Sequence, residues 1–185
     1  GCMFAQKTTR LFFDMLKESQ KGLCCFLRVS TNTNYVLGYQ PSFRWLKQGE
    51  ISANSIIFKK VPRTFTFSNI FQYSAIAIDE VQFLYKPDFL MIERFLINRG
   101  NVYAAGLDKD FMGQPFESTT LFVSHADEVE KLKAICSKCQ QPALHTARLR
   151  GDFNTRLEET TDDMWQPLCR SCYKTYREEY LSIKR

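Results

Sequence analysis

The stretch Ser74-Ala75-Ile76-Ala77-Ile78-Asp79-Glu80-Val81-Gln82-Phe83 decides the fold of this 185-residue chain. Residues 75–78 form an unbroken apolar run, which predicts a short strand buried on both faces of a parallel sheet. Two carboxylates, Asp79 and Glu80, follow at the carboxyl edge, where open α/β sheets bind their ligands. One carboxylate there can hold Mg²⁺ and its neighbour can act as a base. The alternative is a solvated acidic turn after an ordinary strand, and the start of the chain favours the first interpretation.

The first residues, Gly1-Cys2-Met3-Phe4-Ala5-Gln6-Lys7-Thr8, are similar to the phosphate-binding loop G-x-x-x-x-G-K-[ST]. In the intact motif, backbone N–H groups wrap the phosphates, the lysine reaches their oxygens and the hydroxyl holds Mg²⁺. Gly1, Lys7 and Thr8 stand at the required offsets, whereas Gln6 replaces a glycine that is favoured because phosphate approaches the backbone there. The loop and the strand that ends in Asp79 together indicate nucleotide binding. We expect further residues upstream, because the strand that precedes such a loop is missing from this sequence.

Helix and strand patterns alternate along much of the chain, which predicts an α/β parallel sheet flanked by helices. The expected helices cover residues 8–20 and 87–98, and the expected strands cover 23–29, 56–61, 75–78 and 102–107. Residues 36–55 give no clear pattern. Cys24 and Cys25 are predicted to be core residues. His125 and His145 have no obvious partners in the sequence and are predicted to be structural or exposed.

Four of the seven cysteines form two C-x-x-C pairs, Cys136 with Cys139 and Cys169 with Cys172. In an intracellular chain such pairs indicate metal binding more than disulfides. Two such pairs at this separation predict a tetrahedral Cys₄ zinc site without an open coordination position, which is a structural site. Residues 140–168 would then form a long anchored loop that could fold over a substrate. Free or redox-active cysteines are the alternative.

The overall composition is that of a globular protein, with 44% apolar residues and a formal net charge of +5. This mild positive charge fits an anionic ligand without requiring nucleic acid. A zinc-ribbon nucleic-acid-binding protein would explain the cysteines and the basic end of the chain, but it leaves Asp79 and Glu80 without a role. No apolar run approaches the ~20 residues of a membrane span, and no signal peptide opens the chain.

Together these motifs resemble those of the type II (cytosolic-type) thymidine kinases over most of the chain. Residues 1–8 resemble the family pattern G-P-M-F-[SA]-G-K-[ST], and residues 78–83 resemble I-D-E-x-Q-F-F. Residues 106–116 resemble G-L-D-x-x-F-x-G-x-P-F, and residues 126–139 resemble A-D-x-V-x-K-L-x-A-I-C-x-x-C. Residues 169–173 resemble C-R-x-C-Y.

The resemblance implies a P-loop (RecA-like) α/β domain over residues 1–133 and a small zinc-ribbon or lasso domain over residues 134–185. It implies transfer of the ATP γ-phosphoryl group to the 5′-hydroxyl of thymidine or deoxyuridine, a salvage reaction that supplies dTMP for DNA synthesis. It further implies a cytoplasmic homotetramer or homodimer that uses ATP, Mg²⁺ and structural Zn²⁺, with no membrane and no nucleic acid expected as partners.

The resemblance also implies a role for each matching residue. Glu80 would take the proton of the hydroxyl, and Asp79 with Thr8 would hold Mg²⁺. Lys7 would contact the phosphates within the loop that begins at Gly1. The nucleoside would be contacted by Met3, Phe83, Leu107, Phe111, Phe116 and Trp165. The zinc ligands would be Cys136, Cys139, Cys169 and Cys172.

Several positions depart from the family pattern. Gln6 replaces a glycine, and the D-T-R-Y loop appears as Asn32-Thr33-Asn34-Tyr35, without its acid and arginine. An arginine at a transferring phosphoryl group contributes on the order of 10³-fold or more in rate. The [IV]-G-G and tyrosine of the lasso appear as Glu159-Thr160-Thr161 and Trp165. The alternative function is therefore a catalytically impaired homologue that serves as a nucleotide-binding or structural subunit.

Overall fold

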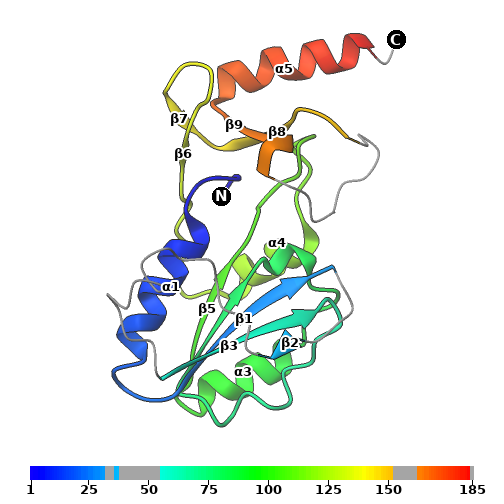
Figure 1. Cartoon of the computed structure of the whole chain (residues 1–185). Coiled ribbons are helices and arrows are strands. Elements are labelled where there is room, and N and C mark those ends of the chain that lie inside the picture. Colours follow the sequence, from blue (N-terminus) through cyan, green and yellow to red (C-terminus); the bar gives the residue numbers. More distant parts are fainter. Residues whose placement is uncertain (32–35, 38–54, 152–161, 184–185) are drawn as a thin grey trace. The chain divides into compact units, whose positions relative to one another are not determined.

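The computed structural model describes residues 1–31, 36–37, 55–151 and 162–183. The chain forms two compact units (Figure 1). One unit is the continuous segment Thr8–Ala105, and the other combines Gly1–Lys7 with Gly106–Arg185. The expectations for Asn32, Asn34 and residues 159–161 lie outside the described residues.

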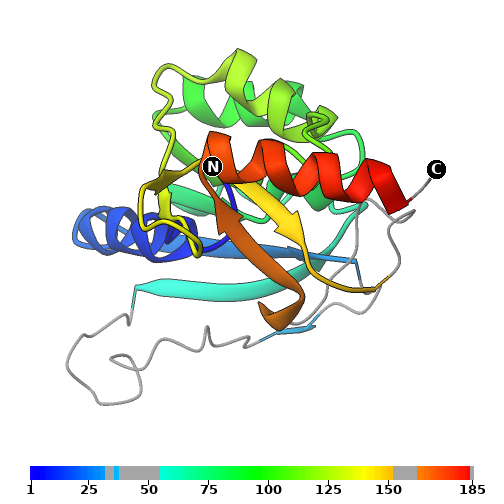
Figure 2. The same cartoon turned by 90° about the horizontal axis from the view of Figure 1, so that it is seen from above.

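The unit Thr8–Ala105 is built on a five-stranded sheet with the order β2-β3-β1-β4-β5. Strands β1, β3, β4 and β5 are parallel, and β2 pairs antiparallel with β3. Figure 2 shows the long strands β1 and β3 side by side. The bounds are β1 Cys24–Ser30, β2 Val36–Leu37, β3 Ile56–Pro62, β4 Ala75–Asp79 and β5 Asn101–Ala105. This sheet confirms the predicted α/β class, and its parallel strands bring their carboxyl ends to one edge.

Strand β4 lies between β1 and β5 in this sheet. All five of its residues are buried, as expected for an apolar strand covered on both faces. Its last residue, Asp79, is opposite Arg28 of β1 in the strand register. The strand therefore delivers a carboxylate to the sheet edge directly beside a cation on the neighbouring strand.

Helix α1, Lys7–Glu18, packs an apolar stripe against one face of the sheet. Its Leu11, Phe12 and Met15 are buried, because residues three and four positions apart share one helix face. The ring centroid of Phe12 lies 6.5 Å from the ring centroid of Phe26 on β1 and 6.0 Å from that of Phe58 on β3. These aromatic contacts fix the start of α1, and with it Thr8, relative to the strands.

Helix α3, Phe89–Ile97, packs against β5. Asp88 caps its N-terminus by accepting a hydrogen bond from the Met91 N–H at 3.2 Å. The sequence predicted a start at Pro87, which lies before this cap. The chain turns after the helix at Gly100, where any Cβ would collide with the Phe95 ring.

The second unit holds a helix, two small antiparallel ribbons and the last helix of the chain. The ribbons pair β6 with β7 and β8 with β9. The bounds are α4 Glu117–His125, β6 Ala134–Ile135, β7 Pro142–Ala143, β8 His145–Arg148, β9 Trp165–Leu168 and α5 Arg170–Ile183. The segment 140–168, expected to be a loop, therefore contains three strands in its described part. Strands of two to four residues carry too little periodicity to be recognised from sequence.

Helix α4 was not predicted from the sequence because its composition favours other structures. It is rich in Ser, Thr and β-branched residues, which are weak helix formers. Two of these hydroxyls instead donate to the preceding turn of the helix, Thr120 to the Phe116 carbonyl at 3.0 Å and Ser124 to the Thr120 carbonyl at 2.9 Å. In the described part of the chain, no helix combines the length and hydrophobicity that crossing a membrane requires.

The aromatic packing of α1 gives a direct stability prediction. Phe12→Ala should lower the free energy of unfolding by about 3–5 kcal/mol, because it removes a fully buried ring and leaves a cavity. Phe13→Ala, on the same helix but 43% exposed, should cost less than about 1 kcal/mol. Chemical denaturation of both variants measures this difference, and equal losses would contradict the packing described for α1.

Candidate active site

The carboxylate of Asp79 lies buried at the carboxyl edge of the sheet. It is 1% exposed, and its two oxygens, 3.2 and 3.0 Å from Thr8 Oγ1, share the single proton of that hydroxyl. Arg28 donates from Nη1 to Asp79 Oδ2 at 3.2 Å. A buried carboxylate beside a threonine hydroxyl offers the hard oxygen ligands that Mg²⁺ prefers. The structure thus brings together Thr8 and Asp79, the two residues predicted to hold Mg²⁺.

Glu80, the predicted base, lies directly after β4 in an unusual backbone conformation. Its φ is 61° and its ψ is 42°, a left-handed conformation that is uncommon for residues other than glycine. Its carboxylate accepts a hydrogen bond from Gln82 Nε2 at 2.5 Å and lies 3.6 Å from Arg28 Nη2. Backbone strain of this kind is concentrated at functional sites. One guanidinium therefore contacts both acidic side chains.

Phe83, a predicted nucleoside contact, follows in the short 3₁₀ helix Val81–Phe83. Its side chain is 7% exposed, and Arg63 Nε donates to its carbonyl at 3.0 Å. The segment after the carboxylates is therefore held firmly within the unit Thr8–Ala105.

In the second unit, the predicted phosphate loop, residues 1–7, is a tight turn. Lys7 Nζ donates to the Cys2 carbonyl at 2.7 Å, so the lysine side chain folds back over its own loop. Gly1 is packed against the Leu132 carbonyl, where a Cβ would collide. Gln6 has φ 55°, in the left-handed region where glycine is favoured. The loop therefore keeps a glycine-type backbone at Gln6 although the residue there carries a side chain.

The phosphate loop packs into the apolar core of the second unit. Cys2 is 1% exposed and Ala5 4% exposed. Cys2 Sγ donates to the Ala143 carbonyl at 3.4 Å, and the Met3 N–H donates to Thr146 Oγ1 at 3.0 Å. The same core contains Ala134, Cys136, Ala143, Ala147, Leu168 and Tyr173. The ribbons around the cysteine pairs therefore support the loop.

The segment 106–116, which contains three predicted nucleoside contacts, is ordered by Asp110. Its carboxylate accepts from the backbone N–H groups of Met112 at 2.9 Å and Gln114 at 2.8 Å. The Phe111 carbonyl accepts from the Tyr173 hydroxyl at 2.7 Å, and the Leu107 carbonyl accepts from Thr119 Oγ1 at 2.7 Å. Phe116 is buried at the start of α4. The backbone of this segment is therefore fixed independently of any ligand.

Arg148, which sequence reasoning missed, joins two of the predicted nucleoside contacts. Its guanidinium carbon lies 5.7 Å from the Phe111 ring centroid and 5.1 Å from that of Trp165. The two rings are themselves 6.3 Å apart, and the Arg148 side chain is almost completely buried. A cation stacked between aromatic faces is attracted by both. Phe111 and Trp165 are thus brought together by a buried arginine.

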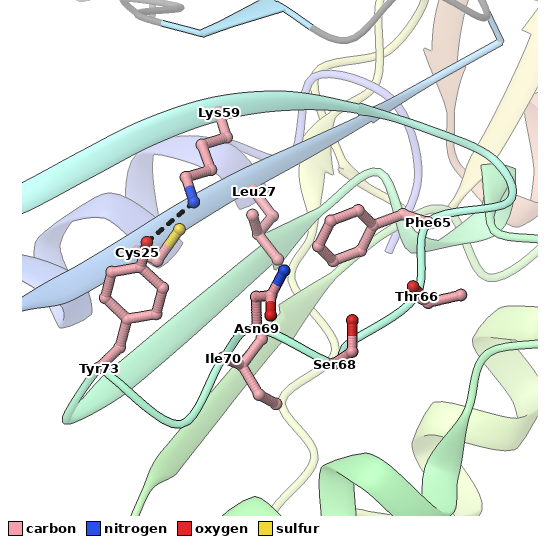
Figure 3. Close-up of a pocket in the computed structure, with 9 residues that line it drawn as sticks. All are labelled: Cys25, Leu27, Lys59, Phe65, Thr66, Ser68, Asn69, Ile70 and Tyr73. Atoms are coloured by element: carbon pink, nitrogen blue, oxygen red, sulfur yellow. Dashed lines mark hydrogen bonds between the residues drawn. The ribbon is translucent and has the colours of Figure 1, made fainter.

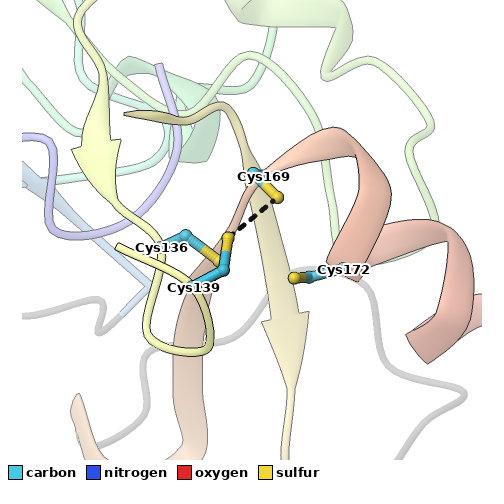
Figure 4. A group of neighbouring side chains, drawn as sticks. All are labelled: Cys136, Cys139, Cys169 and Cys172. Atoms are coloured by element: carbon cyan, nitrogen blue, oxygen red, sulfur yellow. Dashed lines mark hydrogen bonds between the residues drawn. The ribbon is translucent and has the colours of Figure 1, made fainter. Parts of the chain in front are cut away.

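The four cysteines of the two C-x-x-C pairs form one cluster (Figure 4). Cys136 and Cys139 come from the turn between β6 and β7, whereas Cys169 follows β9 and Cys172 lies in the first turn of α5. All four sulfur atoms lie within 4.8 Å of one another, and those of Cys139 and Cys169 are 3.5 Å apart. A tetrahedral zinc ion with Zn–S bonds of ~2.3 Å requires S···S separations of roughly 3.8 Å. The cluster therefore fits the predicted zinc site.

The ionisation of these thiols also fits a metal. Burial raises the pKa of Cys136, but hydrogen bonds from the backbone N–H groups of Cys169, Cys139 and Lys138 outweigh it and lower this pKa to about 6. Hydrogen bonding with the sulfurs of Cys169 and Cys139 raises the pKa of Cys172 to about 12. Four adjacent thiols cannot all ionise without a compensating cation, and Zn²⁺ supplies one.

His145 has a structural role near this cluster. Burial, with Lys109 and Arg170 nearby, lowers its pKa to about 4, so the ring is neutral at pH 7. It stacks on Tyr173 with ring centroids 4.3 Å apart.

Arg28 and Arg148 were not predicted as site residues, for different reasons. An arginine inside the apolar run of residues 23–29 was a usable signal, whereas nothing in the sequence marked Arg148.

The cluster predicts one zinc ion per chain, measurable by elemental analysis of the purified protein. Cys136→Ser should abolish stoichiometric zinc and lower the thermal midpoint of the second unit, because a structural site contributes folding free energy. Cys24→Ser replaces a buried cysteine outside the cluster and should retain the metal. Full zinc occupancy in Cys136→Ser, or none in the unmodified protein, would contradict this assignment.

A sequence profile of the family described as thymidine kinase matches residues 1–173. A thymidine kinase of Mycoplasma mobile is 36% identical over 111 residues, which is 60% of this chain and 55% of that relative. The match thus spans about half of the relative's length. Because the family profile extends over nearly the whole sequence, the chain belongs to the thymidine kinase family.

Proposed function

We propose that this protein transfers the γ-phosphoryl group of ATP to the 5′-hydroxyl of thymidine or deoxyuridine, with Mg²⁺ as a cofactor. The observation that carries the proposal is the cluster of Thr8, Asp79, Arg28 and Glu80 at the carboxyl edge of the sheet. Family membership and the similarity to a protein named thymidine kinase support it.

Thr8 and Asp79 are the residues that would hold Mg²⁺, which neutralises charge on the phosphates when bound. Their hydroxyl and carboxylate are already joined by hydrogen bonds, so the oxygen ligands need little rearrangement. Lys7 would exchange its bond to the Cys2 carbonyl for the phosphates of ATP, within the loop that begins at Gly1. Positioning and charge stabilisation supply most of the catalysis in phosphoryl transfer.

Glu80 would accept the proton of the attacking hydroxyl. Gln82 donates to one of its oxygens, and Arg28 lies near the other, so the carboxylate is held from both sides. Because the backbone of Glu80 is left-handed, its side chain leaves the chain in a different direction from the side chain of the buried Asp79. Two adjacent carboxylates can therefore serve different functions, one toward the metal and one toward the substrate proton.

Met3, Phe83, Leu107, Phe111, Phe116 and Trp165 would contact the nucleoside. The support is the fixed backbone of the segment 106–116 and the stacking of Phe111 and Trp165 on Arg148. Aromatic faces suit a flat pyrimidine base. The closed cysteine cluster has no open coordination position, so its zinc would be structural and take no part in the reaction.

A catalytically impaired homologue is the second candidate, and the backbone at Gln6 favours it. A residue with a Cβ at φ 55° carries a conformational cost that the usual glycine avoids. The altered residues Asn32, Asn34 and Glu159–Thr161 lie outside the described part of the chain. The assembly into a homotetramer or homodimer, the cytoplasmic location, the absence of membrane and nucleic-acid partners, and the division at residues 133 and 134 remain predictions.

Transfer of labelled γ-phosphate from Mg-ATP to thymidine tests the proposal. The zinc-loaded protein should turn over, and Glu80→Gln should lower kcat about 100-fold or more, because the hydroxyl loses its proton acceptor. Glu93→Gln, an exposed carboxylate on α3, is the matched control and should leave kcat unchanged. Absence of turnover in folded, zinc-loaded protein would support the impaired homologue and overturn the active enzyme.

Arg28 gives a second prediction, because the arginine of the D-T-R-Y loop is absent and this guanidinium contacts both acidic residues. Arg28→Met should lower kcat about 100- to 1,000-fold by removing positive charge from the phosphoryl-transfer site. The KM for thymidine and the zinc content should not change. Arg94→Met, an exposed arginine on α3, is the control. An unchanged kcat in Arg28→Met would show that Arg28 has no part in the reaction.

A further inference from the structure

A cavity lies in the unit Thr8–Ala105 and includes none of the residues proposed to take part in phosphoryl transfer (Figure 3). Cys25 and Leu27 of β1 and Lys59 of β3 line it from the sheet. The other lining residues belong to the connection between β3 and β4, and they are Phe65, Thr66, Ser68, Asn69, Ile70 and Tyr73. Its volume is about 210 Å³.

The cavity exists because an irregular segment covers this part of the sheet. The described residues 63–74, which connect the parallel strands β3 and β4, contain no helix, although such connections usually do. Phe67, Ile70 and Tyr73 are buried and anchor the segment to the sheet. The segment leaves space above the strands because it lacks the regular packed surface of a helix.

The chemistry of the lining is asymmetric. Lys59 Nζ donates to the Tyr73 hydroxyl at 2.8 Å, and Figure 3 shows both groups and the Cys25 sulfur at one end, with the Phe65 ring at the other. Lys59 is the only charged side chain among the nine lining residues that the structure describes. Burial raises the pKa of Cys25 to about 11, so its thiol is neutral at pH 7. None of the lining residues in the described part of the chain therefore brings negative charge against an incoming anion.

The remaining groups fit the body of a small ligand. Leu27, Phe65 and Ile70 supply apolar and aromatic surface, and Ser68 and Asn69 supply hydrogen-bonding groups. A volume of 210 Å³ equals about seven water molecules at roughly 30 Å³ each, less than the ~300 Å³ at which drug-sized pockets begin. Only a compact ligand of about ten non-hydrogen atoms can enter.

We propose that this cavity binds a small organic anion, with its carboxylate at Lys59 and Tyr73 and a flat or apolar body against Leu27, Phe65 and Ile70. An ammonium and a phenolic hydroxyl side by side both donate to a carboxylate, and such charge-assisted hydrogen bonds are the stronger ones. The aromatic end favours a planar body. The inference does not depend on the proposed kinase activity.

Benzoate is a suitable probe, and benzamide is a neutral molecule of nearly the same shape. Titration of the full chain, with ¹³C-labelled isoleucine methyl groups observed by NMR, reports on Ile70 within the cavity. Ile78, beside Asp79, reports on binding at the phosphoryl-transfer site. Benzoate should shift the Ile70 signal with a dissociation constant on the order of 1 mM and leave Ile78 unchanged. Benzamide should bind at least about tenfold more weakly.

Substitutions at two neighbouring lysines test whether benzoate binding depends on the charge of Lys59 or only on the shape of the cavity. Lys59→Met keeps the length of the side chain and should abolish the preference for benzoate, whereas Lys59→Arg should retain it. Lys60→Met removes the adjacent lysine of β3, which does not line the cavity, and should bind benzoate as the unmodified protein does. The isoleucine spectrum of each variant also shows whether it is folded.

Three outcomes would overturn the proposal. No shift at Ile70 would show that the cavity takes no such ligand. Equal binding of benzamide and benzoate would show an apolar cavity without anion selectivity. Binding that survives Lys59→Met but disappears in Lys60→Met would place the anion elsewhere. Selective benzoate binding that depends on Lys59 alone would support it.

Discussion

The position of the predicted phosphate loop, residues 1–7, depends on its apolar packing against the ribbons that carry the cysteine cluster. Cys2 and Ala5 are buried together with Cys136, Ala143 and Leu168. Because a zinc ion would link the turn of Cys136 and Cys139 to the start of α5, it would stabilise the core in which the loop is packed. A structural metal would in this way determine the position of the residues that are proposed to bind phosphate, although it would take no part in the chemistry.

The sheet supplies the other requirement of the proposed reaction, two adjacent carboxylates at one edge. Parallel pairing sets Asp79 opposite Arg28, and a buried carboxylate there must be paired or hydrogen-bonded to remain charged. Thr8 and Arg28 meet this need for Asp79, while the left-handed turn directs Glu80 separately. Arg28 belongs to a rigid strand, so its charge is available at this edge independently of the altered residues Asn32 and Asn34.

Patterns of residue type predicted the parts of the structure that strong local signals determine. The apolar run of β4, the stripe of α1 and the paired cysteines were sufficient to predict the α/β class and the cysteine cluster. Gln6 was recognised as unusual, and its φ of 55° shows why glycine is favoured there. Helix α4 was missed because it is rich in weak helix formers, and the ribbons were missed because their strands are only two to four residues long. The stacking of Arg148 on Phe111 and Trp165 joins residues distant in sequence, which no local pattern could reveal.

The most direct test of the central claim is amide hydrogen exchange of residues 2–5 in zinc-loaded and zinc-depleted protein. The Met3 N–H is bonded to Thr146 Oγ1 in the intact unit and should be protected there. If the cysteine cluster holds the phosphate loop in place, removing zinc should accelerate exchange in residues 2–5 at least about tenfold and leave that of β1 unchanged. Protection of the loop that persists without zinc would contradict this account and show that the loop is ordered by other contacts.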